Sequence, residues 1–183
     1  VFSSDNGPVL DDGYKDEAEE KIGDHTPSGL LRGGKYSMFE GGTRVPFMVS
    51  WPGEITPGVS DALVCQLDFM GSFLNLVGIE NPSFDSQNTL NSFLGKSGKG
   101  RDQLVLEASG KIFLRKGNWV MIPPYEGPKI VNQWVKNETA NSQDFQLYNL
   151  SDDLEQLRNL ASDYPKKVQE MIKSMKEIKE RVN

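Results

Sequence analysis

An ordered series of short motifs in the first fifty residues limits most strongly what this chain can fold into. The acid–amide pair Asp5-Asn6 follows the apolar Val1-Phe2, Lys35 follows two glycines, and residues 45–51 form a second apolar run. Both apolar runs predict short buried strands. In open α/β sheets, residues at the carboxyl ends of strands commonly bind ligands, so the series predicts a metal or anion site on an α/β sheet.

The second half of the chain predicts a small antiparallel sheet covered by one helix. Short apolar runs separated by turn residues between positions 104 and 150 predict the strands of a meander. Apolar residues recur at three- and four-residue spacing over 168–182, which predicts an amphipathic helix lying on that sheet. Ser162 or Asp163 is expected to cap this helix, with Pro165 in its first turn.

The domain organisation follows from changes in composition along the chain. Residues 68–77 predict a helix, the Ser/Asn/Gly-rich residues 81–100 predict a linker, and residues 152–161 predict a turn with a short helix. We therefore expect residues 1–80 to complete an α/β domain and residues 81–183 to form an antiparallel β subdomain with a terminal helix. The first part lacks neighbouring strands for its sheet, so we expect more of the protein upstream.

The composition excludes several classes of function. The net charge is −6 and the sequence pI is about 4.9, whereas a nucleic-acid-binding protein needs a basic face. No apolar run approaches the roughly 20 residues of a membrane span. Cys65 is the only cysteine, so the chain has no internal disulfide, and its apolar neighbours predict a small buried residue.

Asp5 and Asn6 are candidate metal ligands. A carboxylate beside a neutral amide oxygen suits a hard cation such as calcium or magnesium, while zinc would favour a nearby histidine or cysteine. The pair is also a common turn sequence, and it supplies too few of the roughly six to eight oxygen ligands that calcium takes. The remaining ligands must come from elsewhere.

Lys35 is a candidate for binding an oxyanion. The two preceding glycines let the backbone approach a ligand closely, and an ammonium group suits one oxygen of a tetrahedral anion. A solvent-exposed surface lysine is the alternative interpretation. Arg44 is expected to form an ion pair with Glu40 or Asp5 rather than to contact a substrate.

His25 and Arg32 are further candidates for contact with a substrate. His25 is the only histidine and lies in a polar insertion, residues 8–34, where it could be a ligand, an acid or an exposed loop residue. Arg32 begins the glycine motif that ends at Lys35. The acidic residues between 11 and 20 match no cation-loop spacing and predict a solvated face.

Taken in order, these motifs resemble the second half of the type I, formylglycine-dependent sulfatases and arylsulfatases of the alkaline-phosphatase superfamily. The resemblance covers most of the chain and is densest over residues 1–53, whereas residues 80–100 and 123–144 match no known part of the family. The motifs that carry it are Ser4-Asp5-Asn6-Gly7, Leu31-Arg32-Gly33-Gly34-Lys35, Phe39-Glu40-Gly41-Gly42-Thr43-Arg44-Val45-Pro46 and Trp51-Pro52-Gly53.

The resemblance implies a fold, a reaction and a site. The chain would be the C-terminal portion of a sulfatase, with the end of an α/β catalytic domain before the β subdomain. Asp5 and Asn6 would be two ligands of the active-site calcium, and Lys35 would contact the sulfate group and offset its charge in the transition state. The substrate would be a sulfated small molecule or glycan, with a sulfated carbohydrate favoured and Arg32 as a further contact. His25 does not match the family's catalytic histidine, which precedes the Asp-Asn pair, and is expected only to contact substrate from the insertion. Family habit favours a periplasmic or secreted location.

The nucleophile that the resemblance implies is not in this chain. In the family it is a formylglycine made from the Cys or Ser of a Cys/Ser-x-Pro-x-Arg motif, and Cys65-Gln66-Leu67-Asp68-Phe69 does not match that pattern. We expect the nucleophile and the remaining metal ligands in the N-terminal part of the same protein, which is therefore the partner of this chain.

Two other functions stay open at this point. One is a phosphatase, phosphodiesterase or phosphoryl transferase of the same superfamily, whose members often bind zinc through an Asp-His pair where Asp5-Asn6 stands here. The other is a non-catalytic module that binds anions or glycans, which the missing nucleophile supports. The amide of Asn6 favours calcium and therefore a sulfatase. The identity of the bound metal would separate a sulfatase from a phosphatase or phosphoryl transferase.

Residues 1–183 alone are expected to hydrolyse no sulfate ester, because the implied nucleophile is absent from them. Sulfate release from an aryl sulfate by the purified chain should equal that of its Lys35→Ala variant. Turnover clearly above that variant would contradict this expectation.

Overall fold

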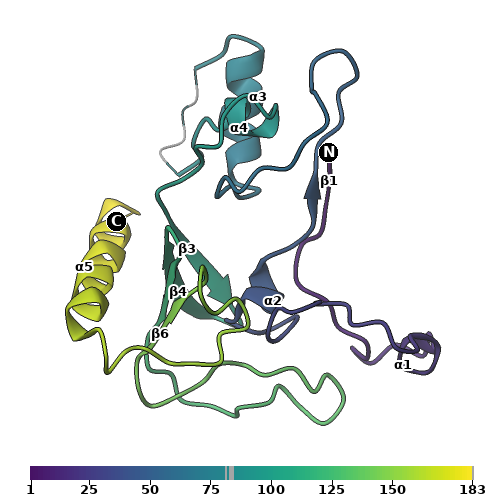
Figure 1. Ribbon diagram of the computed structural model, residues 1–183, viewed down its shortest axis with the longest axis vertical. Helices are drawn as coiled ribbons and strands as arrows, with labels where there is room; N and C mark the ends of the chain where they lie inside the picture. The colour runs from purple at the N-terminus through teal and green to yellow at the C-terminus, as the bar shows by residue number, and fades with distance from the viewer. Residues whose placement is uncertain (81, 83–84, 183) are drawn as a thin grey trace. The chain divides into compact units, whose positions relative to one another are not determined.

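Two sheets and five helices form the part of the chain that the computed structural model describes, residues 1–80, 82 and 85–182 (Figure 1). The chain has two compact units: the first unit contains Val1–Phe2 and Phe47–Gln103, and the second unit contains Ser3–Pro46 and Leu104–Asn183. The elements in chain order are β1 (Phe2–Ser3), α1 (Ala18–Lys21), α2 (Glu40–Thr43), β2 (Phe47–Met48), α3 (Asp68–Leu76), α4 (Leu90–Phe93), β3 (Gln103–Ala108), β4 (Lys111–Lys116), β5 (Trp119–Ile122), β6 (Gln146–Asn149) and α5 (Pro165–Val182).

The four-stranded sheet β3-β4-β5-β6 is the core of the second unit. Neighbouring residues on each strand point to opposite faces, because side chains alternate along an extended backbone. One face carries Phe113 and Val120 and packs on Met38 and Phe39, which belong to the loop that follows Lys35. The sheet therefore supports the segment that contains the candidate site.

The opposite face of this sheet is covered by α5, which lies alongside it in Figure 1. Leu114 and Met121 of the sheet contact Val168 and Met171 of the helix, and all four side chains are buried. The spacing of the apolar residues predicts this helix and its contact with a sheet, and both are confirmed.

The residue that precedes α5 differs from the expected cap. Pro165 is its first residue, where its missing N–H costs no hydrogen bond. Tyr164, rather than Ser162 or Asp163, directly precedes the helix. Residues 152–161 contain turns and bends but no helix, so that part of the prediction is wrong.

The first unit is built around four phenylalanine rings. Phe69 lies 5.8 Å from Phe47, 5.5 Å from Phe73 and 5.5 Å from Phe93 between ring centroids. Phe93 belongs to α4, so the expected linker over residues 81–100 instead contributes a helix to this unit; residues 81, 83 and 84 lie outside the described residues.

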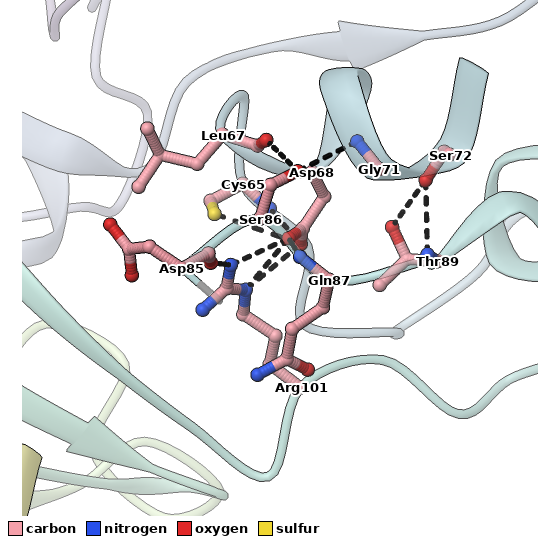
Figure 2. Close-up of polar contacts among 10 residues, drawn as sticks. All are labelled: Cys65, Leu67, Asp68, Gly71, Ser72, Asp85, Ser86, Gln87, Thr89 and Arg101. Atoms are coloured by element: carbon pink, nitrogen blue, oxygen red, sulfur yellow. Dashed lines mark hydrogen bonds and ion pairs between the residues drawn. The ribbon is translucent and has the colours of Figure 1, made fainter. Parts of the chain in front are cut away.

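A buried ion pair fixes the start of α3 (Figure 2). Arg101 Nη2 donates to Asp68 Oδ1 at 2.6 Å, and the Asp68 and Arg101 side chains are only 0% and 6% exposed. Asp68 Oδ1 also accepts the backbone N–H of Gln87 at 2.9 Å. Ser86 ties the same loop to α3, because its hydroxyl accepts from Gly71 N and donates to Leu67 O.

The two strands predicted at Val1-Phe2 and at residues 45–51 are shorter and more exposed than expected. β1 and β2 have two residues each and pair with one another in a two-stranded sheet. Phe2 is 60% exposed and Met48 is 58% exposed, because each strand has only the other as a neighbour in the described part of the chain.

The two compact units do not divide at the predicted boundary, residue 80. Residues 47–103 form one unit, so both sides of that boundary lie together. The division into 1–80 and 81–183 as parts of a longer protein stays a prediction. Within the described ranges, no helix is both long and apolar enough to cross a membrane.

Replacing Arg101 by Met is expected to destabilise the first unit by about 3–5 kcal/mol, because it leaves the Asp68 carboxylate buried without its cation. The measurement is urea unfolding of the protein. Lys96→Met is the matched control, since Lys96 lies 3.9 Å from Glu54 with both side chains about half exposed, and a loss within about 1 kcal/mol is expected there. Equal losses for the two variants would contradict a structural role for the buried pair.

Candidate active site

Close backbone contacts between glycines hold the motifs of the candidate site together. Gly7 N donates to Gly42 O at 2.9 Å, and a Cβ atom on Gly7 would lie 1.8 Å from Gly41 O. A Cβ on Gly42 would lie 2.1 Å from Ser37 O. No side chain fits at these distances, so the motif after Asp5-Asn6 and the motif of α2 can meet only as glycines.

Asp5 and Asn6 come just after the end of β1, with only Ser4 between, as the sequence predicts. The Asp5 side chain is exposed, and among the described residues it forms no ion pair or hydrogen bond. Asn6 Nδ2 donates to Gly7 O at 3.0 Å, which fixes the amide and leaves its oxygen as the acceptor. One charged and one neutral oxygen are thus available to a hard cation.

These two oxygens are not a complete metal site. Within the part of the chain that is described, no group of three or more His, Cys, Asp or Glu residues is arranged to hold a metal ion. The assignment of Asp5 and Asn6 as ligands stays a prediction.

Lys35 is fixed at both its backbone and its side chain. Its N–H donates to Pro8 O at 2.9 Å, which ties it to the segment that begins at Asp5-Asn6. Its Nζ lies 2.5 Å from Asp12 Oδ2. This carboxylate raises the pKa of Lys35, so the ammonium form, which can donate to an oxyanion, is favoured.

Asp12 is the residue of this site that the sequence does not reveal. Its carboxylate accepts from Lys35 and, at 2.9 Å, from the hydroxyl of Tyr36. Both donors lower the pKa of Asp12, with Lys35 the larger cause. The sequence places Asp12 in an acidic stretch that predicts a solvated face, and no local spacing links it to a lysine 23 positions away.

The glycines before Lys35 serve a different contact from the expected one. The sequence predicts that Gly34 lets the backbone approach a ligand. In the structure, a Cβ on Gly34 would lie 2.5 Å from Pro8 O and 2.6 Å from Asn137 Nδ2. The missing side chain of Gly34 therefore lets Pro8 and Asn137 of the same chain approach its backbone closely.

Arg32 is engaged by groups of the chain itself. Its Nε and Nη2 donate to the Glu138 carboxylate at 3.0 and 2.6 Å, and its Nη1 donates to Gln156 O at 2.8 Å. The guanidinium group also lies 4.1 Å from the centroid of the Phe39 ring. Its role as a substrate contact stays a prediction, and the structure shows it joining the loop before Lys35 to residues far along the sequence.

Glu40 carries a second buried charge network. It is 2% exposed, and its carboxylate lies 3.0 Å from Arg115 and 3.6 Å from Arg44. Burial raises the pKa of Glu40, and the two arginines oppose that rise. The expected pairing of Arg44 with Glu40 is confirmed.

His25 and Cys65 take part in none of these contacts. His25 is exposed in the loop after α1, and its predicted contact with a substrate is untested. Cys65 is partly buried in the first unit, where its Sγ lies 3.7 Å from Asp68 Oδ2. Burial raises the pKa of the Cys65 thiol, which disfavours a reactive thiolate.

Comparison with known proteins gives this arrangement a family. A family model described as Sulfatase matches residues 1–79. Over 99% of its length the chain is 40% identical to an N-acetylgalactosamine-6-O-sulfatase of Bacteroides thetaiotaomicron, of which it covers 36%. Human arylsulfatase A is 31% identical over 65% of the chain, which corresponds to 23% of that relative. Residues 1–79 therefore match the sulfatase family model, and nearly the whole chain is similar to a sulfatase, in agreement with its motifs.

Solved structures agree with this assignment. A structure from work on glycosaminoglycan metabolism by Bacteroides thetaiotaomicron matches 97% of the chain with a TM-score of 0.91 and 41% identity, and the match covers 38% of that structure. The PsFucS1 sulfatase from Pseudoalteromonas matches with a TM-score of 0.70 at 24% identity, which shows the fold alone. The predicted α/β architecture is confirmed, and the chain spans little more than a third of these relatives.

Gly42→Ala is expected to lower the free energy of unfolding by about 1–3 kcal/mol, because the added Cβ would overlap Ser37 O. Gly98→Ala is the matched control, since nothing lies within 4 Å of the Cβ it adds. The control should be neutral or stabilising by less than about 1 kcal/mol. The free energy of unfolding of both variants is measured in urea. Equal changes for the two variants would mean that the close contact at Gly42 tolerates a side chain.

Proposed function

We propose that the protein to which this chain belongs is a sulfuric ester hydrolase that acts on a sulfated carbohydrate. The observation that carries the proposal is that backbone hydrogen bonds connect the segment of the predicted metal ligands, Asp5 and Asn6, to the predicted anion-binding residue, Lys35. The segment that begins at Asp5-Asn6 is bound to α2 through Gly7 and to Lys35 through Pro8. Oxygen ligands for a hard cation and a lysine for an oxyanion are thus held in one frame.

Calcium is the metal that the donors fit best. Asp5 and Asn6 would hold it through one carboxylate and one amide oxygen, with the other ligands supplied by the rest of the protein. When bound, the ion would polarise the sulfate oxygens as a Lewis acid. An amide in place of a histidine favours calcium over zinc, and this argues for a sulfatase over the zinc-dependent phosphatases of the same superfamily.

Lys35 would bind one oxygen of the sulfate group. Its ammonium group has three N–H donors, and the contact with Asp12 uses one of them. Asp12 also keeps Lys35 charged, because it raises the pKa of the lysine. A donor held in this way costs little reorganisation when negative charge grows on the sulfate oxygens during the reaction.

The chain would act together with the rest of the same protein. The nucleophile expected for a sulfatase is not among its motifs, and the raised pKa of the Cys65 thiol argues against a substitute. The N-terminal part would supply the formylglycine that attacks sulfur and the remaining metal ligands. His25 and Arg32 stay candidates for contact with the substrate, although Arg32 would first have to leave Glu138.

The names of the relatives support a sulfated sugar as substrate. The bacterial relative and a human relative, 37% identical over 49% of the chain, are both named for the 6-sulfate of N-acetylgalactosamine. The bacterial relative is similar to this chain over 99% of its residues and the human relative over 49%. The proposal takes the class of substrate, a sulfated carbohydrate, from this agreement.

Lys35→Ala in the full-length enzyme is expected to lower kcat/KM for a sulfated sugar by about 100- to 1,000-fold, the loss typical for one donor to a developing oxyanion. Sulfate release measured by ion chromatography tests this. Lys15→Ala is the control, because Lys15 is an exposed lysine of the polar insertion that precedes Lys35, and the activity of this variant should match the wild type.

Two results would contradict the proposed function. One is a full-length enzyme, loaded with calcium, that releases no sulfate from sulfated sugars or aryl sulfates. The other is faster hydrolysis of the matching phosphate ester together with a requirement for zinc, which would move the assignment to a phosphatase of the same superfamily.

A further inference from the structure

A cavity of about 180 Å³ lies in the second unit beside the backbone of Lys35. Its walls come from residues 8–10, residues 27–28 and residues 134–137, together with Glu19. All of these residues belong to the polar insertion or to the segment 123–144, which no family motif covers. The proposed chemistry at Asp5, Asn6 and Lys35 leaves this cavity without a role.

Trp134 provides an exposed aromatic surface on this cavity. The residue is 60% exposed, whereas its neighbour Val135 is 8% exposed and anchors the loop. Asn132 Oδ1 accepts the backbone N–H groups of both Trp134 and Val135 at 2.8 Å. The backbone under the indole is therefore held in place, so a ligand that stacks on it need not order the loop first.

The loop that carries Trp134 is closed by further contacts on both sides. Val131 N donates to Asn137 O at 2.9 Å, and Ile130 forms an antiparallel bridge with Glu138. Glu138 is in turn the partner of Arg32. The position of the indole is thus linked to the glycine motif that ends at Lys35.

Polar groups also line the cavity beside the aromatic surface. Glu19 and Lys136 form an ion pair at the cavity, and both side chains are largely exposed. Charged and amide groups beside an indole face suit a ligand that has both an apolar face and hydroxyl groups, and a sugar ring is such a ligand. The volume is below the roughly 300–1,000 Å³ of pockets for drug-sized ligands, which favours a single ring.

Two residues that line the cavity bond to the backbone of Lys35, whereas the residue that binds its ammonium group does not line the cavity. Pro8, a lining residue, accepts the Lys35 N–H at 2.9 Å, and Asn137, another lining residue, donates to Lys35 O at 3.2 Å. The ammonium group contacts Asp12, which does not line the cavity. A ring bound here would therefore lie next to the sulfated ring rather than in its place.

We propose that this cavity is a carbohydrate subsite, in which Trp134 stacks on the sugar ring adjacent to the sulfated one. The inference rests on the proposed function for the identity of the sulfated ring, while its own evidence is the cavity, the held indole and the bond to Lys35. It makes the segment around residues 130–138 a determinant of oligosaccharide specificity.

The test uses the full-length enzyme, a sulfated tetrasaccharide, its desulfated form and 4-nitrophenyl sulfate. Trp134→Ala is expected to raise the KM for the sulfated tetrasaccharide and the calorimetric Kd for the desulfated one by on the order of tenfold. Kinetics with 4-nitrophenyl sulfate should not change, because that substrate has no second ring. Trp134→Phe should keep most of the affinity, and Tyr164→Ala, a half-exposed aromatic outside the cavity, should behave like the wild type.

The outcomes separate the subsite from the proposed function. If the wild type hydrolyses no sulfate ester, the proposed function fails, and the binding of the desulfated tetrasaccharide still decides the subsite. The subsite is overturned if the wild type does not bind the desulfated tetrasaccharide, or if Trp134→Ala binds it as tightly. An equal loss of activity toward 4-nitrophenyl sulfate would also overturn it, because Trp134 would then act on the structure and not on the second ring.

Discussion

The hydrogen bond from Gly7 to Gly42 is the contact on which the candidate site depends. It brings the chain that leaves β1 against α2, at a distance that no side chain permits. The bond from Lys35 to Pro8 then joins the same segment to the lysine loop. Three motifs that are separate in the sequence become one frame, because backbone atoms bond directly where side chains would have kept them apart.

Charge pairs add the second level of order in the second unit. Asp12 holds Lys35, Glu138 holds Arg32, and Glu40 is buried between two arginines. The first two pairs join the two charged ends of the motif from Arg32 to Lys35, which has no helix or strand of its own, to other parts of the second unit. The sheet of β3–β6 supports this loop from below through Phe39, on which Arg32 also lies.

Local patterns predicted much of the fold, and long-range pairs marked the limit of that prediction. The spacing of apolar residues predicts α5, and the composition of residues 68–77 predicts α3, because those signals are repeated over adjacent turns. The pairs Asp12–Lys35, Asp68–Arg101 and Arg32–Glu138 join residues 23, 33 and 106 positions apart, and nothing local in the sequence indicates them. The family motifs predict where a site lies, whereas the anchoring of its side chains came only from the structure.

The most direct measurement is a crystal structure of the full-length protein with calcium and inorganic sulfate. We expect a cation about 2.3–2.6 Å from oxygens of Asp5 and Asn6, and a sulfate oxygen within hydrogen-bond distance of Lys35 Nζ, with Asp12 still in contact with the lysine. A cation held without Asp5 and Asn6, or a sulfate bound away from Lys35, would contradict this expectation.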